Sequence, residues 1–172
     1  MRLFANLNLQ DTAVERIPLA PALPQEGPAI VPFARWRWLG SPAGLGISFE
    51  PHQVSENDLA ELASAPLLVI SFAKFTDGRG YSLARRLRDV HSFKGELRAS
   101  GDVLLDQLDL MARCGFDSFE ISHEPTIDAL ERGHMPRLAT SYQTAHRNAR
   151  TIRPTLRRSA ATGNAVIQET VR

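Results

Sequence analysis

The stretch that decides the fold is LLVISFAKFTDGRGYSLARRLRDV, residues 67–90. Its first six residues are almost entirely apolar and do not alternate, as in a parallel β-strand buried on both faces. A glycine-containing turn, TDGRG, follows at residues 76–80, and residues 82–90 have the apolar spacing of an amphipathic helix. A buried strand, a tight turn and a helix are therefore predicted, which is the unit of a parallel α/β sheet.

The same unit recurs on both sides of this stretch. Further strands are predicted at 45–49, 96–99 and 119–122, and further helices at 55–63, 100–113 and from 125 to the glycine at 133. Strands and helices that alternate at this pitch imply right-handed crossovers and a mainly parallel sheet. Two architectures remain open, an open sheet and a half of a β/α barrel. The half barrel would leave apolar edges that need a partner, such as a second copy of the chain.

The predicted α/β domain spans residues 45–136, and the segments on either side differ from it in composition. Residues 1–44 are proline-rich and are predicted to be irregular, apart from an edge strand within 29–38 on which Trp36 and Trp38 share a face. Residues 137–172 hold seven arginines and one glutamate. They are predicted to form a mobile, solvated basic tail without a specific nucleic-acid partner.

The composition also excludes several classes of protein. No apolar run approaches the roughly 18 to 20 residues of a membrane span, and residues 1–9 lack the apolar core of a signal peptide. Cys114 is the only cysteine, which excludes an internal disulfide and a thiolate zinc cluster within one chain. The sequence therefore predicts a cytoplasmic protein that does not contact a membrane.

No cofactor follows from the sequence motifs. Leu83 occupies the third glycine position of a dinucleotide-binding fingerprint, and the chain has no iron–sulfur or haem motif. The five histidines show no spacing typical of a metal site.

Candidate site residues gather where the predicted strands end, because the carboxyl ends of parallel strands meet at one edge of a sheet. Gly78 and Gly80 would let a ligand approach the backbone, and Arg79 beside a helix start favours an anion. In the alternative interpretation, Asp77 caps a tight turn and pairs locally with Arg79. The other candidates expected at this edge are Tyr81, Arg98, Gly101, Asp102 and His123.

The predicted helix at residues 100–113 carries candidates of another kind. Asp102 is expected to be its N-cap or to pair with Arg98. Gln107 falls within the apolar arc, where it needs a hydrogen-bond partner, and either a structural bridge or a protein contact would supply one. Arg113 ends a stripe of acidic residues, and Cys114 is expected to be a small buried hydrophobe rather than a redox group.

Three blocks of sequence carry a resemblance to a known family: FTDGRGYSLARRLR at 75–88, FKGELRASGDVLLDQL at 93–108 and ARCGFDSFE at 112–120. They resemble a bacterial family of unknown function whose members are labelled oxidoreductases of sulfite reduction and are typically encoded near assimilatory sulfite reductase. The resemblance covers about residues 45–122, and Ala73 departs from it where the family usually has proline. The positions that match its motif are Asp77, Gly78, Arg79, Gly80, Tyr81, Arg98, Gly101, Asp102, Asp106, Gln107, Arg113, Cys114 and Gly115.

This resemblance implies a role in assimilatory sulfite reduction, although the sequence offers one thiol and no other electron carrier. We therefore expect an accessory protein that binds the reductase or an anion through the turn at Gly78 and Arg79 and through the Gln107 side. The alternative is an enzyme for a small phosphate or sulfur oxyanion. In that case Arg79 and Arg98 would hold the anion, and Asp77 or Asp102 would be the acid–base group.

Overall fold

The computed structural model describes residues 29–134 and, outside that range, only the backbone of five short strands. These are β1 (Arg2–Ala5), β2 (Asn8–Asp11), β3 (Glu15–Arg16), β9 (Thr155–Arg158) and β10 (Ala165–Gln168). The predicted irregular segment ahead of residue 29 and most of the predicted basic tail lie outside the described residues. Within the tail, β9 and β10 pair as a two-stranded antiparallel sheet.

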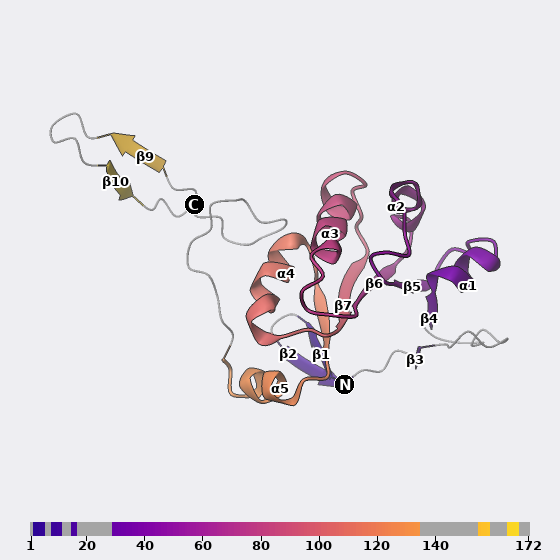
Figure 1. The fold of residues 1–172 in the computed structure, drawn as a ribbon, viewed down its shortest axis with the longest axis horizontal. Coiled ribbons are helices and arrows are strands. Elements are labelled where there is room, and N and C mark those ends of the chain that lie inside the picture. Colours follow the sequence, from indigo (N-terminus) through magenta and orange to yellow (C-terminus); the bar gives the residue numbers. More distant parts are fainter. Residues whose placement is uncertain are drawn as a thin grey trace.

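Five parallel strands form the centre of the larger sheet (Figure 1). They are β4 (Ala29–Pro32), β5 (Gly46–Phe49), β6 (Leu67–Phe72), β7 (Glu96–Gly101) and β8 (Ser118–Ile121). Strand β3 pairs parallel to β4 at one edge, and β1 pairs antiparallel to β8 at the other, followed by β2. The prediction of a mainly parallel α/β fold is confirmed, and the sheet already includes β4, ahead of residue 45.

The helices alternate with the strands of this sheet. They are α1 (Phe33–Trp38), α2 (Glu56–Leu62), α3 (Arg79–Asp89), α4 (Leu108–Cys114), which follows one turn of 3-10 helix, η1 (Leu105–Gln107), and α5 (Glu124–Glu131). Figure 1 shows α4, α3, α2 and α1 following one another across the molecule in the order of the strands. In the part of the chain that the structure describes, none of the helices has the length and apolar character to cross a membrane.

The order of the strands separates the two sheet architectures. Strands β4 to β8 lie side by side in chain order, whereas a doubly wound sheet reverses direction at a switch point. Right-handed crossovers in an unreversed order place every helix on one face, as in a β/α barrel. One apolar cluster agrees with this, because it joins Leu59, Leu87, Met111 and Ile127 from four helices to a single face of the sheet. The five strands therefore have the unreversed order that a half barrel requires, and not the order of a doubly wound sheet.

Local signals explain where two of the helices begin and end. The Asp58 carboxylate accepts hydrogen bonds from the backbone N–H of Ser55, 2.7 Å away, and from its hydroxyl, so these two residues cap the start of α2. Pro125 lies in the first turn of α5, and Gly133 follows that helix with a φ of 74°. Both positions match the preference for proline at helix starts and for glycine after helix ends.

The predicted strand at residues 29–38 is wrong in its second half. Only Ala29–Pro32 is extended, and Phe33–Trp38 forms helix α1. Phe33 and Trp36 are three residues apart and stack with ring centroids 6.0 Å apart beside Phe49. Burial of this helical pair outweighs the two-residue spacing of the tryptophans, and Trp38 is left exposed.

Candidate functional site

The turn after β6 holds the closest ion pair among the predicted site residues. The Arg79 Nε and Nη2 atoms donate to Asp77 Oδ1 and Oδ2 over 2.9 and 2.8 Å, and the Arg79 backbone N–H also donates to Oδ1. Hydrogen bonds from the Arg79 side chain hold the pKa of Asp77 below its usual value. This carboxyl is therefore ionised near neutral pH, and its geometry matches the local pairing considered from the sequence. The guanidinium is already engaged in a bidentate contact, which leaves less of it for a free anion.

The glycines around this turn have different surroundings. A Cβ on Gly80 would lie 2.5 Å from the ring of Phe72, so this glycine lets α3 pack closely on β6. Gly101 has a φ of 90°, and a Cβ there would lie 2.2 Å from the Phe72 carbonyl oxygen. Packing against β6 therefore explains both residues without a ligand. Only Gly78, of these three, faces open space, because a Cβ there would have no neighbouring atom within 4 Å.

The expectation that Asp102 caps the helix predicted at residues 100–113 is wrong. Residues 102–104 are not helical, η1 begins at Leu105, and α4 begins at Leu108. The Asp102 carboxylate instead accepts a hydrogen bond from the backbone N–H of Phe75 over 3.0 Å. The positive φ of Gly101 turns the chain away from a helical path, which delays the helix start.

Gln107 also makes a hydrogen bond to Phe75, in the β6–α3 loop. Its Nε2 donates to the carbonyl oxygen of Phe75 over 2.9 Å. Together with the bond from Asp102, this fixes both backbone polar groups of Phe75, while its side chain stays 45% exposed. The structural bridge predicted for Gln107 therefore exists, and it reaches the β6–α3 loop rather than a neighbouring helix.

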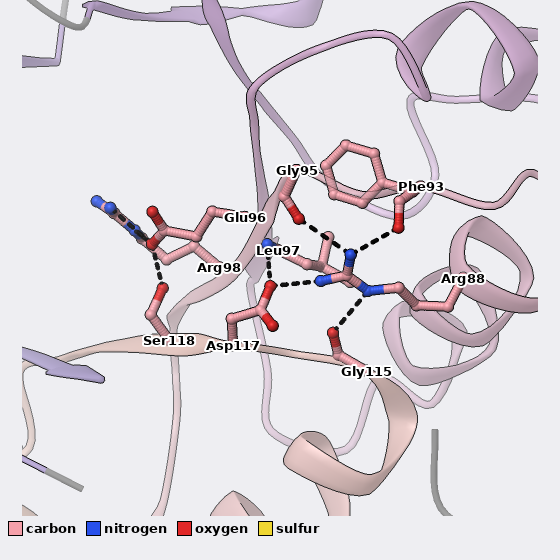
Figure 2. A network of polar contacts seen from close by, with 9 residues as sticks. All are labelled: Arg88, Phe93, Gly95, Glu96, Leu97, Arg98, Gly115, Asp117 and Ser118. Carbon is pink, nitrogen blue, oxygen red and sulfur yellow. Dashed lines mark hydrogen bonds and ion pairs between the residues drawn. The ribbon is translucent and has the colours of Figure 1, made fainter. Parts of the chain in front are cut away.

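Arg98 does not lie with the other candidates at the carboxyl edge. Its side chain is on the sheet face that the helices leave free, where Nη2 lies 2.9 Å from Glu96 and Nη1 lies 3.3 Å from Glu120 (Figure 2 shows Arg98 with Glu96 and Ser118). The predicted ion pair with Asp102 is therefore wrong. Side chains alternate across a strand, so Arg98 and Ser100 point to the face opposite Leu97 and Ala99.

Sequence reasoning missed the polar cluster on this face. Ser71 and Ser100 share a hydrogen bond of 2.9 Å between their hydroxyl oxygens, and Ser118 donates to Glu96. The buried Glu120 lies on β8, two residues after Ser118. A usable signal was present, because polar residues stand at every second position of β7 and β8.

Tyr81, in the first turn of α3, lies near Cys114, the last residue of α4. Burial raises the pKa of Tyr81 to about 12, and the nearby Cys114 and Asp106 add to the shift. Burial also raises the pKa of the Cys114 thiol, although Arg85 and Arg113 act in the opposite direction. A thiol with a raised pKa is a poor nucleophile at neutral pH, so the geometry agrees with a packing role for Cys114.

His123 lies at the start of α5, where its Nδ1 is 2.8 Å from the Thr126 hydroxyl. The Thr126 backbone N–H also donates to the His123 carbonyl oxygen. The ring and the backbone of His123 therefore both make hydrogen bonds to the first turn of α5. Among residues 29–134, no group of three or more histidine, cysteine and carboxylate side chains is placed to hold a metal ion.

A second network that the sequence did not reveal lies at the opposite edge of the sheet (Figure 2). The Arg88 side chain is fully buried and donates to three carbonyl oxygens, those of Phe93, Gly95 and Gly115, over 2.8 to 3.0 Å. It also pairs with Asp117, whose carboxylate accepts the backbone N–H of Leu97. At the amino-terminal edge of a parallel sheet such contacts serve stability rather than ligand binding.

Comparison with known proteins adds the family to this geometry. No curated protein and no solved structure matches the chain. A model of a bacterial protein family of unknown function, DUF934, matches residues 46–153, more than half of the 172 residues. The matched range begins at β5 and includes the Asp77–Arg79 turn, the Phe75 loop and the Arg88 network. The chain therefore belongs to this bacterial family of unknown function, DUF934.

Proposed function

We propose that this protein is an accessory protein that binds a partner protein through the β6–α3 loop, with Phe75 as the anchor. The observation that carries the proposal is the contrast between a fixed backbone and an exposed aromatic ring. Asp102 and Gln107 hold the Phe75 backbone, while its side chain remains 45% exposed. A loop that is already ordered loses little conformational entropy on association, and exposed aromatic residues dominate many protein interfaces.

The surroundings of Phe75 favour a protein partner over a small anion. Arg79 is paired with Asp77 in a bidentate contact, so a free anion would have to displace a carboxylate that is already in place. The open space around Gly78 lets a partner approach the backbone three residues after Phe75. An interface that covers this loop would use both features without breaking the ion pair.

The identity of the partner rests on the sequence resemblance alone. Members of the family that the sequence resembles are typically encoded near assimilatory sulfite reductase. The reductase is therefore the first partner to test. The proposed role is to bind or help to assemble the reductase, with electron transfer left to the reductase itself.

The test measures binding between the purified protein and purified assimilatory sulfite reductase by biolayer interferometry. Phe75→Ser is expected to weaken the complex about tenfold or more, the usual size of a loss at an interface anchor. Val90→Ser is the matched control, because Val90 is 65% exposed and lies at the other end of α3. Thermal melting of both variants checks that each is folded.

Two results would contradict the proposal in different places. If wild-type protein does not bind the reductase, the partner is wrong. If it binds and Phe75→Ser binds as tightly as Val90→Ser, the β6–α3 loop is not the contact surface.

A further inference from the structure

Three neighbouring loops at the carboxyl edge of the sheet carry an excess of negative charge. The Phe75 backbone N–H donates to Asp102, which joins the β6–α3 loop to the loop after β7. The pKa of Arg79 is raised by its hydrogen bonds to Asp77 and also by the charge of Glu50, which follows β5 directly, so the loop after β5 lies beside the same turn. Residues 50–55, 73–79 and 102–107 together hold four carboxylates and two cations, which leaves a net charge of −2 with histidine neutral: Glu50, Asp77, Asp102 and Asp106 against Lys74 and Arg79.

The loops at the opposite edge of the same strands lack this excess. Residues 39–45, 63–66 and 90–95 precede β5, β6 and β7, and Lys94 is their only residue with a full charge at neutral pH. The acidic groups therefore gather at the edge that also presents the exposed ring of Phe75. Complementary charge attracts a partner to such a surface and orients it there, so this edge favours a basic partner.

Two of these carboxylates belong to residues that hold the Phe75 loop. Asp102 accepts the Phe75 backbone N–H over 3.0 Å, and Asp106 directly precedes Gln107, whose amide donates to the Phe75 carbonyl oxygen. Asp102 and Asp106 are both exposed, and neither forms an ion pair within residues 29–134. A cation from outside could therefore reach both carboxylates without displacing another cation and without entering the core.

We infer that the partner contacts this surface through a basic segment, with an arginine side chain on the Phe75 ring and its charge beside Asp102 and Asp106. A guanidinium suits this combination, because it stacks on aromatic rings and also donates charge-assisted hydrogen bonds to carboxylates. The inference rests on the proposed function and adds to it the chemistry of the partner. All three side chains that would make the contact are exposed.

The test titrates the ¹⁵N-labelled full chain with two peptides at equal ionic strength and follows the backbone amide signals by NMR. The probes are acetyl-Arg-Leu-Arg-Leu-Arg-amide and its glutamine analogue. The basic peptide is expected to move the amide signals of Phe75, Thr76 and Gly78 and to saturate, whereas the glutamine analogue leaves them unchanged. Added salt is expected to weaken the binding of the basic peptide, because exposed charges are screened.

Four variants separate the contributions of charge and ring. Asp102→Asn and Asp106→Asn are each expected to weaken binding of the basic peptide about threefold, the usual size of an exposed ion pair, and asparagine at 102 keeps an oxygen for the Phe75 N–H. Phe75→Leu keeps an apolar side chain but loses the ring, and it is also expected to weaken binding about threefold. Asp128→Asn removes a carboxylate from the exposed surface of α5 and is expected to bind like wild type.

Binding to purified sulfite reductase keeps this inference apart from the proposed function. If the wild type binds the basic peptide but not the reductase, the reductase is the wrong partner and the basic-segment inference stands. If the wild type binds the reductase and the double variant Asp102→Asn, Asp106→Asn binds it equally tightly, the inference is overturned and the Phe75 anchor stands. Two further results overturn it: equal responses to the two peptides, and a dimer of the free protein that Phe75→Leu dissociates, which would assign the surface to a second copy.

Discussion

At the scale of single residues, the two glycines of the TDGRG turn have different physical roles. Gly80 is pressed against the ring of Phe72, and any side chain there would have to push α3 away from β6. Gly78 has a helical backbone, with φ and ψ of −65° and −13°, and it faces open space. Gly80 is thus required by packing inside the protein, whereas no packing contact requires a glycine at position 78.

Matched alanine substitutions test this difference. Gly80→Ala is expected to lower the free energy of unfolding by roughly 1 to 3 kcal/mol, because the added methyl group overpacks the contact with Phe72. Gly78→Ala is expected to be neutral or to stabilise by about 0.5 kcal/mol, because alanine restricts the unfolded chain and fits this backbone. Urea denaturation of the two variants measures both values. Equal losses would show that the tight contact at Gly80 does not decide its identity.

At the scale of elements, the sequence predicts the strands better than the side-chain contacts between them. The apolar run of β6 is found at the predicted residues, Leu67–Phe72. The sequence prediction placed Arg98 at the carboxyl edge because it considered only how close the residue lies to the end of its strand. The sheet face that the side chain occupies follows instead from the alternation of polar and apolar residues along β7. Asp102 was misplaced because its partner, the backbone of Phe75, is 27 residues away in the chain. Contacts between separate loops leave no local pattern in a sequence.

Helix α2 offers a test of an element by pH. Hydrogen bonds from Ser55, together with Arg37, hold the pKa of Asp58 below its usual value of 3.8. A lowered pKa in the folded state means that the ionised carboxylate stabilises the protein above pH 3.8 and that this contribution is lost as the pH falls through the folded pKa. Asp58→Asn is therefore expected to cost about 1 kcal/mol at pH 7, the size of a helix cap, and little at low pH.

Urea midpoints at pH 7 and pH 3 measure this dependence. Asp128→Asn provides a control for the loss of a carboxylate, because Asp128 is exposed on α5 and has no ion pair within the described residues. The same loss for Asp58→Asn at both pH values would mean that its ionised carboxylate does not cap α2.

At the scale of the whole molecule, Arg88 joins parts of the chain that are far apart in sequence. It extends from α3 to the loop before β7 and to the loop before β8, with partners up to 29 residues away. A Cβ on Gly115 would lie 2.6 Å from the Arg88 side chain, so that loop is shaped around the arginine. The network fixes the amino-terminal ends of two neighbouring strands to one helix.

Removal of this side chain is expected to be severe. Arg88→Met removes the buried guanidinium that donates to Asp117 and to three carbonyl groups, and it is expected to cost about 3 to 5 kcal/mol in the free energy of unfolding. Arg85→Met removes a half-exposed arginine from the same helix and is expected to cost less than about 1 kcal/mol. Chemical denaturation of the pair measures the difference, and similar losses would show that the buried network adds no more than a surface pair.

The unreversed strand order also bears on how the chain is made. During synthesis, β5, β6, β7 and β8 each leave the ribosome next to a strand that has already emerged, so the parallel sheet can grow in one direction. A doubly wound sheet would have to add strands at both sides of its first strand. Strand β1 is the exception, because it is made before the parallel strands and its partner β8 is made after the other four. Strand β1 can pair with β2 as soon as both have emerged, but the two strands can join the parallel sheet only once β8 is made, so the pairing of β1 with β8 completes the larger sheet.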